Sequence, residues 1–101
     1  LDVRVPQIIY KNSNLIDSIG VDAFKNLNIL AEFDLSNNKL REIKSFYFKN
    51  LGSLLKLKLN QNGINLIESG SFQSFTKAQS IDLSDNFIIN IEPGAFKGNL
   101  F

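Results

Sequence analysis

The chain repeats itself with a period of 24 residues, and this period constrains its fold more than any other feature of the sequence. Three columns of the repeat keep the step: asparagine at Asn14, Asn38, Asn62 and Asn86, isoleucine at Ile19, Ile43, Ile67 and Ile91, and phenylalanine at Phe24, Phe48, Phe72 and Phe96. Because three columns share one period, the chain is predicted to be an array of equivalent units. The units are expected to span residues 6–29, 30–53, 54–77 and 78–101, as one domain.

Each unit contains a short stretch in which apolar and polar residues alternate, as in a half-buried strand. In the second unit Phe33 and Leu35 fall on one face of that strand, whereas Asp34 between them faces the other way. Strands that recur once per unit must all return in the same direction. This favours a parallel sheet wound in a right-handed coil over a series of hairpins.

The asparagine and phenylalanine columns are predicted to fill the interior of the coil. Each asparagine follows a strand, where a buried side-chain amide can bond main-chain groups of the turn that would otherwise lack partners. The phenylalanines are expected to stack on the convex side, where the strand side chains do not reach. Helix breakers such as Gly20, Ser45 and Pro93 lie between the columns, so the convex side is expected to be mostly irregular, with little α-helix.

The strand and the asparagine after it form one motif that recurs in three units. Aligned, the units read Leu30-x-x-Phe33-x-Leu35-x-x-Asn38-x-Leu40, Leu54-x-x-Leu57-x-Leu59-x-x-Asn62-x-Ile64 and Ala78-x-x-Ile81-x-Leu83-x-x-Asn86-x-Ile88. This motif resembles the 24-residue class of leucine-rich repeats of animal extracellular proteins, such as Toll-type receptors, Slit, insect immune recognition proteins and small matrix proteoglycans. The resemblance implies an α/β-type solenoid of about four repeats, with a concave parallel sheet and a mostly irregular convex side.

Two features depart from that pattern. In the first unit the strict period puts Lys11 where an inward leucine is expected, whereas Ile8 and Tyr10 fit only with one residue inserted before Ile19, so two registers stay open. The chain also lacks the cysteine-rich caps of similar extracellular proteins at either end. We therefore expect it to be a fragment of a longer solenoid.

Two other folds compete with the leucine-rich-repeat solenoid. Asn62-Gly63 between two apolar stretches is a signal for a type I′ hairpin, but the 24-residue period outweighs it. A right-handed β-helix has asparagine ladders and coils of similar length, but several strands per coil and no phenylalanine-bearing turn block. The repeat solenoid is favoured over both.

The composition excludes most enzyme chemistry. The 101 residues include no His, Cys, Met or Trp, which removes thiolate nucleophiles, Ser-His-Asp relays and nearly all zinc sites. Asp82 and Asp85 are a carboxylate pair of the kind that glycosidases use, but both are expected to be solvated. We therefore predict a chain that is not an enzyme and has no catalytic residue, metal site or cofactor. With 11 basic and 10 acidic side chains, and no apolar stretch near the roughly 18 residues of a membrane span, it is expected to contact neither nucleic acid nor a membrane.

The outward side chains of the predicted strands are the candidate partner-binding site. They carry both charges and one aromatic ring, and comprise Tyr10, Glu32, Asp34, Lys56, Lys58, Asp82 and Asp85, with Ile8, Ser36, Asn37, Asn60, Gln61, Ser80 and Ser84 extending the rows. Neighbouring strands lie about 4.8 Å apart, so Lys58 can pair with Asp34 and Asp82. Two interpretations stay open: the charges only satisfy one another, or the face as a whole binds a protein. Tyr10 is either a contact for a partner or part of the core.

The resemblance implies a non-enzymatic module that recognises a protein ligand through its concave face, within an extracellular or cell-surface receptor, adhesion or innate-immune protein. The alternative is a structural protein that associates with copies of itself or with a companion chain. Its contacts would be uncapped ends, for example Ile8 or Leu100, or Phe46 and Tyr47, which replace the small residues of the other units on the convex side. These two aromatic residues could instead pack inside a swollen turn.

Overall fold

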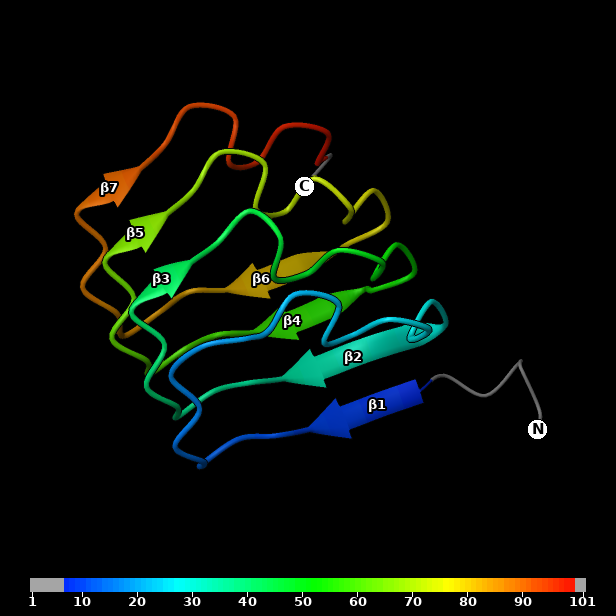
Figure 1. The fold of residues 1–101 in the computed structure, drawn as a ribbon, viewed down its shortest axis with the longest axis horizontal. Coiled ribbons are helices and arrows are strands. Elements are labelled where there is room, and N and C mark those ends of the chain that lie inside the picture. Colours follow the sequence, from blue (N-terminus) through cyan, green and yellow to red (C-terminus); the bar gives the residue numbers. More distant parts are fainter. Residues whose placement is uncertain (1–6, 100–101) are drawn as a thin grey trace.

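A computed structural model describes residues 7–99 and forms a coil built around two stacks of parallel strands (Figure 1). The first sheet has the order β1-β2-β4-β6 and takes one strand from each repeat, namely β1 (Gln7–Tyr10), β2 (Leu30–Asp34), β4 (Lys56–Lys58) and β6 (Ser80–Asp82). Each strand pairs in parallel with the strand of the next repeat. The predicted solenoid with one concave parallel strand per repeat is confirmed.

A second parallel sheet follows the first around the coil and was not predicted from the sequence. It contains three strands of two residues each, in the order β3 (Glu42–Ile43), β5 (Leu66–Ile67) and β7 (Asn90–Ile91). The isoleucine column supplies its inward side chains, and Ile43 and Ile67 are completely buried. Strands of two residues are too short to show alternation of apolar and polar residues, so the isoleucine column is the feature of the sequence that marks this sheet.

The first strand keeps the strict period. Ile9 pairs with Phe33 and Tyr10 pairs with Asp34, and a register shift between Gln7 and Ile8 takes up the irregularity. Ile9 therefore points inward and is half-buried, whereas Ile8 and Tyr10 point outward. The register that needs an insertion is wrong. Lys11 takes the place of an inward leucine and is exposed in the first described coil.

The phenylalanine column forms the second part of the core, as predicted. Ring centroids follow one another at 6.3 Å from Phe24 to Phe48, 6.1 Å from Phe48 to Phe72, and 5.1 Å from Phe72 to Phe96. Phe48 and Phe72 are fully buried, and Phe75 packs against both. These stacked rings tie each repeat to the next on the side away from the concave strands.

The asparagine column forms the predicted ladder of side-chain hydrogen bonds. Asn62 Nδ2 donates to the main-chain oxygens of Leu35 and Leu59 at 3.1 Å each, and its Oδ1 accepts from Leu40 N at 3.1 Å. Asn38 and Asn86 make equivalent contacts, so each of these three amides bonds both its own turn and the turn before it. The exposed Asn14, in the first described coil, bonds only its own turn.

The residue directly before each ladder asparagine has a left-handed backbone. Its φ lies between 56° and 58° in all four repeats, at Ser13, Asn37, Gln61 and Asp85. Asn and Asp tolerate this conformation better than most residues, because their short side chains bond locally. This turn lets the chain leave the concave sheet and places the ladder amide inside the coil.

None of the described residues forms a helix, in agreement with the predicted irregular convex side. The convex segments are successive turns instead. Within residues 7–99 there is accordingly no helix of the length and apolar character that a membrane crossing requires.

The aromatic pair on the convex side divides its roles between core and surface. Tyr47 is 5% exposed and Phe46 is 38% exposed, with their rings edge to face at 5.3 Å. We expect Phe46→Ser to lower the free energy of unfolding by about 1 kcal/mol or less, and Tyr47→Ser to lower it by about 3 kcal/mol. Urea denaturation followed by circular dichroism measures both. Equal losses would mean that Phe46 is as much a core residue as Tyr47.

Candidate functional site

The concave sheet presents two rows of outward side chains across its strands. One row runs Ile8, Glu32, Lys56, Ser80 and the other runs Tyr10, Asp34, Lys58, Asp82, in the register of the paired strands. All eight line a hollow of about 250 Å³ on this face. The structure therefore brings together six of the seven predicted partner-binding residues: Tyr10, Glu32, Asp34, Lys56, Lys58 and Asp82.

Asp85 lies apart from this hollow. It is exposed in the left-handed turn that follows β6 and is not among the lining residues. The left-handed backbone of Asp85 forms the turn that positions Asn86. Asp82 and Asp85 therefore occupy different parts of the repeat, and within residues 7–99 no group of three acidic side chains is placed to hold a metal ion.

Within residues 7–99, one ion pair crosses the concave strands, and it involves Lys56 instead of the predicted Lys58. Lys56 Nζ lies 3.8 Å from Glu32 Oε1 across β2 and β4. Lys58 lies in register between Asp34 and Asp82, yet no ion pair joins it to either carboxylate in the described part of the chain. The predicted ladder of ion pairs through Lys58 is wrong. Its exposed ammonium group is left facing the hollow.

Asp34 is turned back onto its own strand end. Its Oδ1 accepts hydrogen bonds from Ser36 N at 2.9 Å and from Ser36 Oγ at 2.6 Å, and the residue is only 9% exposed. The expectation that Asp34 and Ser36 are exposed on the concave face is wrong, because each uses the other as its partner. Asp34 mainly holds the turn after β2, and it contributes little accessible charge.

Asp82 and Ser84 repeat this contact in a more exposed position. Ser84 Oγ donates to Asp82 Oδ1 at 2.7 Å, and Ser84 N donates to the same oxygen at 3.0 Å. The two hydrogen bonds, with a smaller contribution from the positive charge of Lys58, lower the pKa of the Asp82 carboxyl below its ordinary value. The hydrogen bonds of this turn therefore stabilise the ionised form of Asp82.

We expect Ser84→Ala to raise the pKa of Asp82 towards the ordinary aspartate value, because the side-chain donor is its largest cause of lowering. A carboxyl whose folded-state pKa is lowered stabilises the fold above its unfolded pKa, and this stability is lost as pH falls through the folded pKa. The wild type should keep this contribution to lower pH than the variant. Nuclear magnetic resonance titration of the Asp82 side-chain carbon measures the pKa directly. An unchanged midpoint in the variant would contradict the role given to Ser84.

Tyr10 is the most accessible aromatic side chain of the concave face. It is 66% exposed, lines the hollow, and stands in register beside the covered Asp34. The alternative that Tyr10 packs in the core is wrong. Tyrosine offers a large apolar surface together with a hydroxyl group, and it is enriched where proteins meet their partners.

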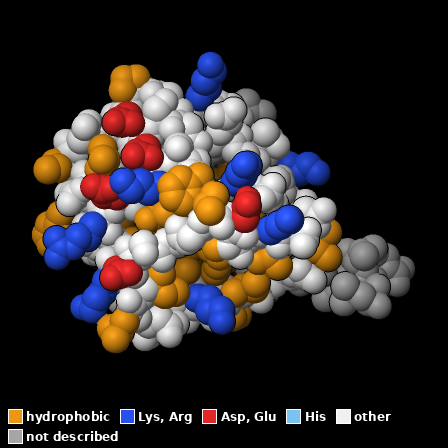
Figure 2. Space-filling model, in the orientation of Figure 1, with side chains coloured by type: hydrophobic (Ala, Val, Ile, Leu, Met, Phe, Trp, Pro, Cys, Tyr) orange, Lys and Arg blue, Asp and Glu red, His pale blue; other side chains and the backbone are white. Residues whose placement is uncertain are grey.

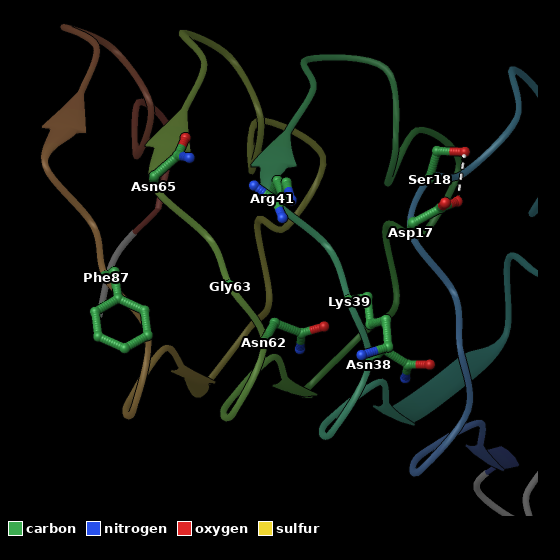
Figure 3. Close-up of a pocket in the computed structure, with 9 residues that line it drawn as sticks. All are labelled: Asp17, Ser18, Asn38, Lys39, Arg41, Asn62, Gly63, Asn65 and Phe87. Atoms are coloured by element: carbon green, nitrogen blue, oxygen red, sulfur yellow. Dashed lines mark hydrogen bonds between the residues drawn. The ribbon is translucent and has the colours of Figure 1, made fainter.

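A second hollow, which the sequence analysis did not identify, lies on the flank of the coil between the concave strands and the second sheet. Its volume is about 930 Å³, and Figure 3 shows Lys39, Arg41, Gly63 and Phe87 among the residues around it. The signal was present in the column that reads Leu15, Lys39, Gly63 and Phe87, where one unit alone has no side chain. Because this column is neither apolar throughout nor constant in residue type, its period does not reveal it.

Comparison with known proteins identifies the fold in two solved structures. The chain is similar to a chain of the Toll–Spatzle complex from Drosophila, with a TM-score of 0.82 and 25% sequence identity over 92% of this chain and 12% of that chain. It is also similar to a chain of the TLR13–ssRNA13 complex, with a TM-score of 0.55 and 22% identity over 91% of this chain and 20% of that chain, a likeness that shows the fold alone. The chain thus spans only a small part of either protein.

The family comparison covers almost all of the sequence. The family model described as the BspA type leucine rich repeat region matches residues 5–100 in six copies. A search of curated proteins finds no match. The repeated strand, the buried asparagine ladder and this match agree, and the chain belongs to the BspA-type leucine-rich repeat family.

Proposed function

We propose that the chain is a non-enzymatic protein-recognition module that binds a protein ligand through its concave strand face. The observation that carries the proposal is the hollow on that face, which is lined by the exposed Tyr10, by the Glu32–Lys56 ion pair and by Lys58, for which no ion pair is found within residues 7–99. A surface that combines an aromatic ring with charges of both signs suits a protein partner. The absence of His and Cys from the sequence argues against most catalytic roles.

The proposed setting is an extracellular receptor, adhesion or innate-immune protein. Its support is the likeness to the Toll–Spatzle complex, whose description joins development and innate immunity. In longer leucine-rich-repeat proteins the concave strands of many repeats form one extended binding surface. We propose that residues 7–99 contribute four strands to such a surface.

A protein partner is favoured here over a nucleic acid. A nucleic-acid partner is an alternative because the chain is also similar to TLR13, whose structure is that of a complex with single-stranded RNA. Binding of a nucleic acid by phosphate contacts requires several unpaired cations. The net charge of this chain is +1, and Figure 2 shows acidic and basic side chains interspersed over the face in view.

Photo-crosslinking tests this function. The photoreactive amino acid p-benzoylphenylalanine replaces Tyr10 in one variant and the convex Phe46 in a second, and each variant is incubated with the secreted and surface proteins of the source organism. We expect a defined partner to crosslink from position 10 and not from position 46. A partner captured only from position 46 would contradict recognition through the concave face.

A second candidate function, self-association through the ends of the coil, has its own supporting observation. The face of the first described coil carries an apolar hollow of about 400 Å³, lined among others by Ile9, Ile16, Phe24 and Leu27. Hydrophobic side chains also gather along the lower edge of Figure 2, over this coil. Exposed apolar surface of this kind marks sites of association.

Of the two residues named for the ends of the coil from the sequence, Ile8 does not line that hollow. Ile8 faces the concave side instead, and Leu100 lies outside the described residues. Ile16→Asp is therefore the better test. Sedimentation of the wild type as a dimer or larger species, and of the variant as a monomer, would favour association over free ligand recognition.

A further inference from the structure

The flank hollow exists because one repeat lacks a side chain. Lys39 and Phe87 come from the repeats on either side of Gly63 and occupy the same column. A Cβ atom on Gly63 would meet only the main-chain oxygen of Leu40, at an ordinary 3.7 Å, and the residue does not have a left-handed backbone. The glycine is thus not required by the backbone at this position, and its effect is to leave the middle of the flank open.

The floor of the hollow is held by main-chain hydrogen bonds between repeats. Gly63 N donates to Leu40 O at 2.9 Å, and Phe87 N donates to Ile64 O at 3.0 Å. Asn65 N also donates to Arg41 O at 2.8 Å. With adjacent segments about 4.8 Å apart, Lys39 and Phe87 stand roughly 10 Å from each other across a preformed surface.

The two sides of the hollow differ in chemistry. Lys39 and Arg41 are exposed on one side, and neither takes part in an ion pair among residues 7–99. On the other side Phe87 is 76% exposed, and the neighbouring Ile89 is 89% exposed. Figure 3 shows Arg41 and Asn65 at the two strands above the glycine, and Lys39 and Phe87 on either side of it.

The side-chain amide of Asn65 adds a polar group between these two sides. It lines the hollow and makes no hydrogen bond within the described chain. An amide offers both a donor and an acceptor, which is what the main chain of an extended peptide needs. A phosphate backbone needs several donors and cations in succession, whereas two cations, Lys39 and Arg41, are among the described residues that line this hollow.

We propose that this flank hollow binds an extended acidic segment of a partner protein. A carboxylate of the segment meets Lys39 and Arg41, its main chain bonds the Asn65 amide over Gly63, and a large apolar side chain packs on Phe87. An extended chain advances about 3.3 Å per residue and its side chains alternate between two faces, so acidic and apolar residues that both face the hollow stand two or four positions apart. This surface is separate from the concave face and does not depend on the function proposed for it.

Titration with a synthetic peptide, followed by nuclear magnetic resonance of the labelled backbone amides, tests the proposal. The probe is a short capped peptide with aspartates two and four positions before a phenylalanine, so that all three side chains share one face. Its matched controls are the same peptide with asparagines in place of the aspartates, and a short oligothymidylate. We expect saturable shifts at Lys39, Arg41, Gly63 and Phe87 with the acidic peptide, and about tenfold weaker binding of the asparagine peptide.

Two glycine variants separate the hollow from general effects on the fold. Gly63→Gln fills the hollow, whereas Gly52→Gln adds the same side chain where a Cβ meets only Ser74 O, at 3.8 Å. We expect Gly63→Gln to weaken binding of the acidic peptide by about tenfold. Gly52→Gln and the double variant Lys56→Gln/Lys58→Gln should leave the affinity for the peptide unchanged.

Several results would overturn the proposal. They are the absence of saturable shifts at millimolar peptide, shifts confined to the concave Tyr10 and Lys58, and equal binding by wild type and Gly63→Gln. Tighter binding of the oligothymidylate than of the acidic peptide would assign the hollow to a nucleic acid instead. Loss of peptide binding in the Lys56→Gln/Lys58→Gln variant would mean that the peptide binds the concave face and not the flank hollow. If the concave face is found not to bind a protein, the result for the flank hollow is unaffected.

Discussion

Asn62→Ala is expected to lower the free energy of unfolding by about 4 kcal/mol. The substitution leaves the main-chain NH of Leu40 without its partner, and a buried unsatisfied group costs roughly 1–3 kcal/mol. It also removes one hydrogen bond each from Leu35 O and Leu59 O, which Asn38 and Asn86 still bond, at about 0.5–1.5 kcal/mol for each bond lost. Asn62 itself is 9% exposed, so water does not readily replace the amide. The measurement is the urea midpoint and slope by circular dichroism.

Asn14→Ala is the matched control, because it removes the same side chain from the same column. Asn14 is exposed and, among the described residues, its side chain bonds only Lys11 O and Asn12 O of its own turn. We expect a loss of about 1 kcal/mol or less. If the two variants unfold at the same urea concentration, the ladder between repeats is not what stabilises the coil.

Phe72→Ala is expected to lower the free energy of unfolding by about 4 kcal/mol, for a different reason. The ring of Phe72 is completely buried and contacts the rings of Phe48, Phe75 and Phe96. Its removal leaves a cavity in the middle of the stack, and both neighbouring repeats lose packing. The milder Phe72→Leu keeps a folded protein for the measurement if the alanine variant is unfolded.

Phe87→Ala controls for the loss of a phenylalanine from the surface. Phe87 is 76% exposed, and its substitution should change the free energy of unfolding by about 0.5 kcal/mol or less. Thermal and urea unfolding of the two variants together separate core from surface. A Phe72→Ala variant as stable as Phe87→Ala would contradict the stacked core.

The sequence was sufficient for the fold where one residue type recurs in a column. Asn62 and Phe72 could be placed inside the coil because each column combines a fixed step with a single chemical requirement, a buried amide in one case and a large ring in the other. The first strand follows the same logic. The strict period, which puts Ile9 inward and Lys11 at an inward position, is the register that the structure adopts.

Features that depend on contacts between neighbours could not be read from the period. Alternation places Asp34 outward, but its burial results from Ser36 and from the flanking strands. The Asp-x-Ser pattern at Asp34 and again at Asp82 is the local signal that could have indicated it. In the same way, register puts Lys58 beside two carboxylates, but both accept hydrogen bonds from their own serines, and within residues 7–99 neither forms an ion pair with Lys58.

The sequence predicted which face of the sheet carries the candidate site, but it did not predict the contacts among the residues of that face. Strand polarity determines which side chains point outward, and six of the seven named residues do line one hollow. Asp85 could not be excluded, because its left-handed turn has no constant residue type among Ser13, Asn37 and Gln61 of the other repeats. The flank hollow depends on the missing side chain of Gly63, which is visible only when the neighbouring repeats are placed beside it.

Protein recognition through the concave face determines the dissociation constant of the partner that is captured from position 10, and this constant is the quantity to measure. The double variant Lys56→Gln/Lys58→Gln removes both concave lysines without placing a third carboxylate between Asp34 and Asp82. The control Lys25→Gln/Lys49→Gln removes two exposed lysines of the convex turns. We predict binding about tenfold weaker for the concave variant and unchanged for the control, at equal thermal stability. An unchanged dissociation constant for the concave variant, or the same loss in the convex control, would show that the concave face does not bind the partner.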